Sequence, residues 1–275
     1  MTAYLERMKD HLSGYKEQKL GISEHGTFRY RGRELEYSHI LPKDLLWLNI
    51  LEPFREQIQK YAENDIKLHK YFHHLNSSQA FALNLFVPFF GGSASERTAL
   101  IHSLQLADEG SDEWHAEYVA DAAEGTNVDF AWRNSQAGWT FCEVKLTEQE
   151  FGRAKNDARH LKKLTEIYKP VLSEHFAPEL LEPLAFFESY QIFRNIWLAA
   201  QDSRNEVIFL IPRENGILWK QLGKVTEFLR PTLAARVHVT AIEDCLSCLA
   251  SSIELSDSSR HYASLLAEKY VPPAA

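Results

Sequence analysis

The sequence predicts an α/β or α+β fold in which helices flank a mixed central sheet. Three consecutive strands are predicted at residues 117–120, 127–133 and 139–146, where short extended segments alternate with turn-rich stretches. Two further short apolar segments, at 207–211 and 237–240, predict later strands separated by helical sequence. Helices, then a strand meander, then alternating strands and helices are typical of a mixed sheet covered by helices.

The chain is expected to form one domain over residues 1–275. Hydrophobic residues make up 45% of the 275, which is ample for a core, and no Gly/Ser-rich or Pro-rich linker or internal repeat divides the sequence. Within this domain we expect a mostly helical N-terminal extension over 1–75 and an α/β core over 76–275.

The N-terminal extension is predicted to be helical except at residues 21–33, where glycines and aromatic residues favour a loop or a small hairpin. Apolar residues at nearly helical spacing predict a helical segment over 42–74. His69, His73 and His74 fall in this stretch, and without a third metal ligand we expect them to be ordinary helix histidines. A buried helix should follow over 80–86, because Asn76, Ser77 and Ser78 supply N-cap residues directly before an apolar run.

Beyond the three strands, the charged segment 148–168 has the composition of a helix. A second, apolar helix is expected after Pro183, since proline is well accommodated in a first helical turn. A terminal helix is predicted over residues 242–269.

Composition restricts location and partners. The charged N-terminus lacks a secretory apolar run, and no stretch approaches the roughly 18 consecutive apolar residues of a membrane helix. Three irregularly spaced cysteines fit a reducing compartment, so we expect a cytoplasmic protein without a membrane partner. The formal net charge of -8 argues against a generally basic nucleic-acid-binding surface, although a catalytic groove needs only local positive potential.

The chemical signal lies in the second and third predicted strands. Alternation places Asp129 on the face opposite Val128 and Phe130, and the same period of two places Glu143 and Lys145 together on one side of the next strand. If the two strands form a hairpin through the turn at 134–138, Asp129 and Glu143 meet across it. Two carboxylates would then converge beside an amine.

Paired carboxylates repel each other unless a cation lies between them, and oxygen ligands with bound waters suit Mg²⁺ or Mn²⁺. Such an ion would activate water for attack on a phosphodiester, and Lys145 could orient that water. The alternative is a structural ion-pair cluster at the sheet edge. The acid-x-Lys triplet alone decides little, because it also occurs at Glu17 and Asp65 in segments that look helical.

These residues resemble the core of the PD-(D/E)XK nuclease superfamily, with Asp129 at its acidic strand position and Glu143-Val144-Lys145 as its paired motif. Longer segments, HLNSSQA at 74–80, GTNVD at 125–129 and EVKLTEQEFG at 143–152, resemble a largely uncharacterised prokaryotic branch of it. The resemblance implies a restriction-endonuclease-like αβββα core, Mg²⁺ at the sheet edge and cleavage of nucleic acid, above all DNA. Val128 stands where the motif often has proline.

The same resemblance suggests further site residues. Glu117, in the first strand, matches an additional acid that would complete the metal shell. Gln191 and Arg194, on one face of the helix after Pro183, match a polar helix position that could hold a water or a phosphate. Glu117 could equally be a solvated strand end, and Gln191 and Arg194 an ordinary helix-surface pair.

Substrate contacts are expected directly after the motif. Arg153 and Lys155 open a basic run that could follow a phosphate backbone, although a solvated helix face explains the run nearly as well. A homodimer is a reasonable expectation, since nucleases that cut both strands often pair two sites by symmetry. Two alternatives stay open: a catalytically silent protein of the same fold that binds nucleic acid or a protein partner, and an unrelated α/β protein in which the cluster is structural.

Overall fold

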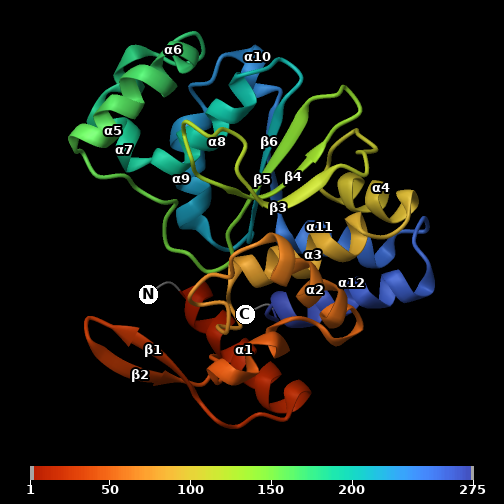
Figure 1. The fold of residues 1–275 in the computed structure, drawn as a ribbon. Coiled ribbons are helices and arrows are strands. Elements are labelled where there is room, and N and C mark those ends of the chain that lie inside the picture. Colours follow the sequence, from red (N-terminus) through yellow and green to blue (C-terminus); the bar gives the residue numbers. More distant parts are fainter. Residues whose placement is uncertain (1–2, 274–275) are drawn as a thin grey trace. The chain divides into compact units, whose positions relative to one another are not determined.

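The computed structural model describes residues 3–273, and the chain forms two compact units (Figure 1). The first unit contains the chain up to Glu109, the short segment Val144–Thr147 and the chain from Ala241 onward. The second unit contains Gly110–Glu143 and Glu148–Thr240. The expectation of a single domain over 1–275 stays a prediction.

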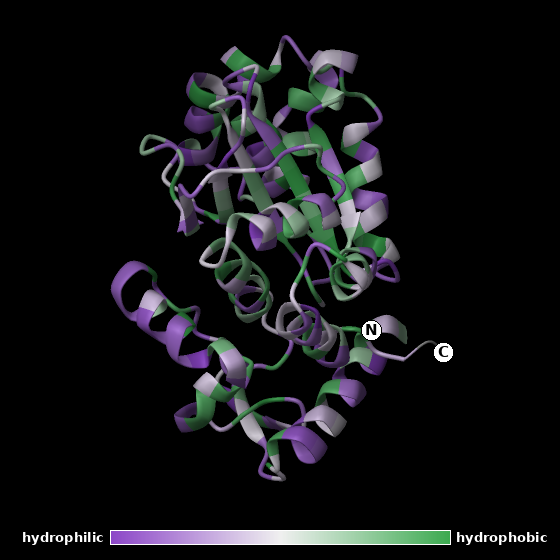
Figure 2. Cartoon of the chain, turned by 90° about the vertical axis from the view of Figure 1, so that its right-hand side faces the viewer, coloured by the Kyte–Doolittle hydropathy of each residue, from purple (hydrophilic) through white to green (hydrophobic). Residues whose placement is uncertain are grey.

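The central sheet is mixed, as predicted, and helices flank it. Within the described residues its strands lie in the order β3-β4-β5-β6-β7. Neighbouring strands are antiparallel from β3 to β5, whereas helices connect β5 to β6 and β6 to β7, as crossover connections require. Figure 2 shows the hydrophobic character of these strands in green. The bounds are β3 (Trp114–Tyr118), β4 (Val128–Arg133), β5 (Trp139–Val144), β6 (Glu206–Ile211) and β7 (Val237–Ala241).

Helices of the second unit pack a largely aromatic core with the sheet. Phe186 and Phe193 stack with ring centroids 4.9 Å apart, and both are fully or almost fully buried together with Ala131, Phe141 and Phe209 of the strands. Burying one such phenylalanine contributes about 1.5–3 kcal/mol. The helices are α5 (Ala158–Lys163), η3 (Leu164–Tyr168), α6 (Lys169–Leu172), η4 (Pro178–Leu181), α7 (Pro183–Glu188), α8 (Tyr190–Ala200), α9 (Gly216–Thr226) and α10 (Pro231–Ala234).

The first unit is mainly helical and includes the predicted buried helix, α3. Ser77 caps this helix by accepting a hydrogen bond from the Ala80 N–H at 3.3 Å, and every residue from Gln79 to Phe90 is buried. The loop or hairpin expected at 21–33 is a β-hairpin. The elements are α1 (Ala3–Leu20), β1 (Gly26–Tyr30), β2 (Arg33–Tyr37), η1 (Lys43–Asn49), η2 (Glu52–Phe54), α2 (Arg55–Asp65), α3 (Ser78–Phe90), α4 (Ala94–Ser103), α11 (Ile242–Ser251) and α12 (Asp257–Tyr270).

Two predicted helices are wrong in extent because side chains hold the backbone in other conformations. The segment predicted as helix from residue 148 is irregular up to Asp157, whose carboxylate caps α5 by accepting from the His160 N–H at 3.0 Å. The helix expected over 42–74 ends at Asp65, and the Asn49 side chain donates to carbonyls in the irregular stretch beyond it. The three histidines at 69, 73 and 74 are therefore not on a helix.

The predicted terminal helix over 242–269 is also wrong, because it breaks into α11 and α12 at a serine-rich segment. Ser256 begins α12 by accepting a hydrogen bond from the Ser259 N–H at 3.1 Å. Serine hydroxyls compete with helical backbone bonds, which favours a cap over a continuous helix.

The turn between β4 and β5 lies at residues 134–138, as predicted. The Asn134 carboxamide oxygen accepts hydrogen bonds from the Gly138 N–H at 2.9 Å and the Gln136 N–H at 3.2 Å. A β-carbon on Gly138 would collide with the backbone carbonyl of Arg204. Gly138 therefore permits a close backbone approach that a larger residue prevents.

Replacing Gly138 by alanine is expected to lower the free energy of unfolding by about 1–3 kcal/mol, since the backbone must shift to admit the methyl group. Gly223 lies within α9 with open space around it, so Gly223→Ala should raise stability by about 0.5–1 kcal/mol. Urea denaturation of the two variants measures both effects. Equal stability of the two variants would contradict the assigned close approach at Gly138.

Candidate functional site

Asp129 and Glu143 occupy matching positions on adjacent antiparallel strands. The registered pairs of β4 and β5 run from Arg133 and Trp139 up to Phe130 and Cys142, so Asp129 and Glu143 are the next residues along each strand. Directly opposed residues of an antiparallel pair project to the same face, with β-carbons about 5 Å apart. The register therefore brings both carboxylates to one face of the sheet.

The Glu143 carboxylate is buried, with 2% of the residue exposed, and three side chains of α8 contact it. Gln191 donates to Oε1 at 2.5 Å. Arg194 donates to Oε2 at 3.0 Å, and Asn195 donates to the same oxygen at 2.8 Å. Charge pairing with Arg194 offsets the cost of burying the carboxylate.

The three donors share one face of α8 because they lie at positions i, i+3 and i+4. The opposite face carries Ile192, Phe193 and Ile196 into the core. Gln191 and Arg194 were candidates from the sequence, and the structure joins both to Glu143. Asn195 was missed, although its spacing of four from Gln191 would have indicated it.

Gln191 also connects Glu143 to the chain that follows β5. The Gln191 side-chain Oε1 accepts a hydrogen bond from the Gly152 N–H at 2.9 Å. The backbone N–H of Gln191 donates to the Gly152 carbonyl at 3.0 Å. The neighbouring candidates Arg153 and Lys155 are exposed on this irregular segment, and Arg153 pairs with Glu150 at 2.7 Å. Gln191 thus fixes the start of the basic segment relative to Glu143.

Glu117 lies on β3 beside Asp129, between the registered pairs of Ala116 with Phe130 and Tyr118 with Val128. Its φ of 52° is in the left-handed region, so the strand departs from regular geometry here. The Glu117 carboxylate accepts a hydrogen bond from the Asn127 side chain. This contact joins Glu117 to a residue ten positions along the chain, and the role of Glu117 toward a metal stays a prediction.

Lys145 follows β5 directly and lies in the segment Val144–Thr147, which is part of the first unit. Only 9% of the residue is exposed. Its predicted action beside Glu143 rests on the separation of two residues along the chain and stays a prediction.

The donor set at β4 and β5 suits a hard divalent cation. Glu143 presents two carboxylate oxygens, and the α8 side chains donate to both of them. Mg²⁺ commonly binds through one or two carboxylates and completes its shell with water and substrate phosphate. Across residues 3–273, no three His, Cys, Asp or Glu side chains gather closely enough to hold a metal by themselves. A metal here would thus depend on Asp129, Glu143 and non-protein ligands.

A buried network around Glu124 supports the start of α8. The Glu124 carboxylate accepts hydrogen bonds from Tyr168 at 2.6 Å, from Tyr190 at 2.9 Å and from Lys163 at 3.2 Å. Burial acts to raise the pKa of Glu124, but hydrogen bonds from Thr126 and the two tyrosines outweigh it and lower the pKa to about 2. Burial raises the pKa of Tyr190 to about 12. Since Tyr190 precedes Gln191, this network anchors the helix turn that reaches Glu143.

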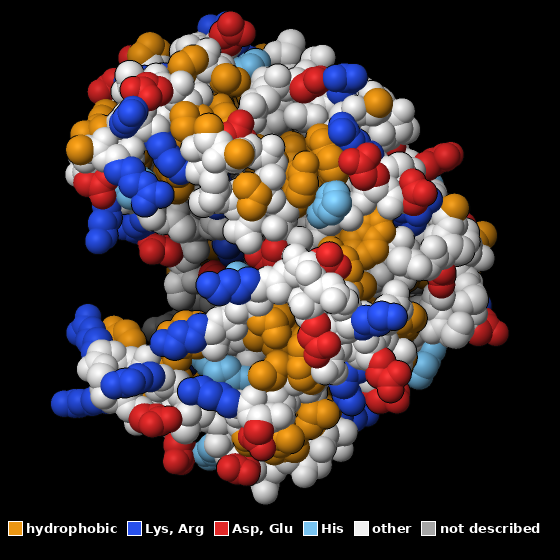
Figure 3. All heavy atoms as spheres, in the orientation of Figure 1, with side chains coloured by type: hydrophobic (Ala, Val, Ile, Leu, Met, Phe, Trp, Pro, Cys, Tyr) orange, Lys and Arg blue, Asp and Glu red, His pale blue; other side chains and the backbone are white. Residues whose placement is uncertain are grey.

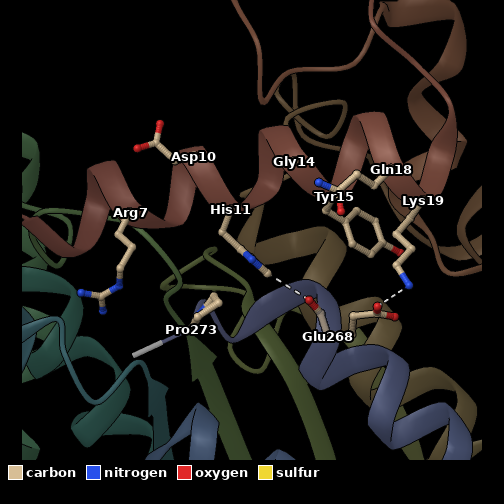
Figure 4. A pocket seen from close by; sticks show the side chains of 9 residues that line it. All are labelled: Arg7, Asp10, His11, Gly14, Tyr15, Gln18, Lys19, Glu268 and Pro273. Carbon is tan, nitrogen blue, oxygen red and sulfur yellow. Dashed lines mark hydrogen bonds and ion pairs between the residues drawn. The ribbon is translucent and has the colours of Figure 1, made fainter. Parts of the chain in front are cut away.

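A separate pocket of about 420 Å³ lies in the first unit between α1 and the end of α12 (Figure 4). His11 contacts the Glu268 carbonyl at 3.0 Å, and Lys19 pairs with the Glu268 carboxylate. None of the candidate residues from the sequence lines this pocket.

Within the described part of the chain, no helix combines the length and apolar content of a membrane span.

The comparisons with known proteins give one match. No curated protein and no solved structure matches the chain. A family model described as "restriction endonuclease associating with ARP" matches residues 9–271. Because this match covers nearly the whole chain, the protein belongs to that restriction-endonuclease family.

Proposed function

We propose that the protein is a divalent-metal-dependent nuclease that hydrolyses phosphodiester bonds in DNA. The observation that carries the proposal is the placement of Asp129 and Glu143 on one face of adjacent strands, with a polar face of α8 against Glu143. Membership of a restriction-endonuclease family supports the reaction class. The order of helix, three-strand meander and helix supports the finer assignment to the PD-(D/E)XK superfamily.

Asp129 and Glu143 would hold Mg²⁺ or Mn²⁺, and Glu117 would add a ligand through water. When bound, such an ion supplies charge stabilisation at the phosphate and lowers the pKa of a coordinated water. Gln191, Arg194 and Asn195 orient the Glu143 carboxylate in this proposal.

Three basic residues have assigned roles in the proposed reaction. Lys145 would hold the attacking water and balance charge in the transition state. Arg153 and Lys155, exposed after β5, would contact the DNA backbone. Their positive charge is local, which reconciles DNA binding with a net charge of -8.

The direct experiment incubates purified protein with linear, circular and single-stranded DNA and with RNA. Separate reactions contain Mg²⁺, Mn²⁺ or a chelator. We expect DNA cleavage with either ion and none with chelator, because the reaction needs the ion at Asp129 and Glu143. Absence of cleavage on every substrate, or cleavage that survives the chelator, would contradict the proposal.

A second candidate function is that of a catalytically silent protein of this fold that binds nucleic acid or a protein partner. The contacts of Glu143 favour it, because Arg194 already balances its charge and three donors engage its oxygens. The family description includes association with ARP, which makes ARP the partner to test. Stable complex formation with ARP, without cleavage by either the protein or the complex, would support this alternative.

A further inference from the structure

The N-terminal hairpin of β1 and β2 carries two faces of opposite chemistry. The registered pairs include Phe28 with Leu35 and Tyr30 with Arg33. Because directly opposed residues share a face, these four side chains and Tyr37 lie together. The remaining pairs, Arg29 with Glu34 and Thr27 with Glu36, form the other face. Both glutamates of the strands therefore lie on the second face, and the first face is aromatic and basic.

Cations border the aromatic side chains of the first face. Arg31, in the turn, places its guanidinium 5.2 Å from the centre of the Tyr30 ring. Lys70 places its amine 5.2 Å from the ring of Tyr71, which lies 5.1 Å from Phe28. Tyr30 is 49% exposed and Tyr71 39% exposed. Figure 3 shows Lys and Arg side chains, in blue, gathered around this hairpin at the lower left of the view.

A small pocket of about 180 Å³ opens beside the aromatic face, and it is lined by Lys9, Phe28, Tyr37, His39, Ile40 and His74. Burial lowers the pKa of His74 to about 3 and that of His39 to about 4, so both rings are neutral at pH 7. The two neutral rings therefore add aromatic surface without charge to the wall of the pocket.

We infer that this face of the hairpin and the adjacent pocket bind single-stranded nucleic acid. Tyr30 and Tyr71 would stack on unpaired bases, and Arg31 and Arg33 would contact phosphates. Exposed aromatic rings interleaved with cations are the chemistry that single strands require, whereas the bases of a duplex are already stacked on one another. The site is independent of cleavage at Glu143 and goes beyond the proposed function.

The test measures fluorescence anisotropy of a labelled oligothymidine and of a duplex of equal length. The buffer contains chelator and no divalent metal, so that binding is measured without cleavage. We expect the single strand to bind more tightly than the duplex. Tyr30→Ala and Tyr71→Ala should each weaken binding about tenfold, since one stacked base contributes on the order of 1–3 kcal/mol and 1.4 kcal/mol is tenfold in affinity.

A matched pair of arginine variants separates the two faces. Arg33→Ala should remove one phosphate contact. The slope of log affinity against log salt concentration should then become shallower by about 0.7. Arg29→Ala removes the same charge from the opposite face and should leave affinity within about twofold. Thermal denaturation confirms that each variant is folded. Preference for the duplex, unchanged binding in both tyrosine variants, or equal losses in both arginine variants would overturn the inference. Binding without cleavage would support it even if the proposed nuclease activity fails.

Discussion

Asp129→Asn and Glu143→Gln are each expected to lower the rate of metal-dependent DNA cleavage by about 100-fold or more. Each substitution removes one negative oxygen from the proposed cation site while keeping the shape of the side chain. Metal stabilisation of phosphoryl transfer contributes several kcal/mol, and each 1.36 kcal/mol corresponds to a factor of ten in rate. Single-turnover cleavage at saturating Mg²⁺ measures the chemical step.

Folding must be separated from chemistry in this experiment. Glu143→Gln leaves the buried Arg194 without its charge partner, so this variant carries a stability cost. Asp129→Asn keeps every contact between Glu143 and α8, which makes it the cleaner variant. Glu113→Gln is the matched control, since Glu113 is an exposed acid paired with Arg133 at the other end of β4. Equal rates in Asp129→Asn and the control would exclude Asp129 from the reaction.

Glu124→Ala is expected to lower the free energy of unfolding by about 3–5 kcal/mol. The substitution removes the buried carboxylate to which the Lys163 amine and the Tyr168 hydroxyl both donate, and breaking a buried pair from one side has this cost. Glu166→Ala is the matched control, because its pair with Lys162 is exposed and spans 3.8 Å. The control should change stability by less than about 0.5 kcal/mol. Urea denaturation of both variants measures the difference, and similar losses would contradict the assignment.

The same network predicts how stability depends on pH. The pKa of Glu124 is about 2 in the folded chain and ordinarily 4.5, so the folded state favours the ionised form. Its contribution is therefore fully present above pH 4.5 and is lost as the pH falls toward 2. Between these values, wild-type stability should fall more steeply than that of Glu124→Gln. If the free energy of unfolding falls equally steeply with pH in both proteins, Glu124 does not titrate as described.

The strands and the turn between β4 and β5 were predictable because their signals are local. Alternating residues at 128–132 and 139–144 and turn residues at 134–138 determine the hairpin, and the hairpin determines the register of Asp129 with Glu143. The partners of Glu143 on α8 were predictable in part, since Gln191 and Arg194 lie at helical spacing.

Other features depended on contacts between distant residues. Segment 148–157 has helical composition, but side chains from α8 and α9 hold its backbone: Gln191 accepts from the Gly152 N–H and Gln221 from the Phe151 N–H. Tertiary contacts outweigh intrinsic helix propensity in such a segment. The Glu124 network joins a loop to tyrosines more than forty residues later, and no local pattern indicates that pairing.

Binding of Mn²⁺, measured by isothermal titration in the absence of nucleic acid, tests the central claim most directly. If Asp129 and Glu143 hold the cation, the wild-type protein should bind Mn²⁺, and Asp129→Asn should lose that binding while thermal denaturation shows that it is still folded. Equal Mn²⁺ affinity in the wild-type protein and in Asp129→Asn, or no binding in the wild-type protein, would contradict a metal site at these strands.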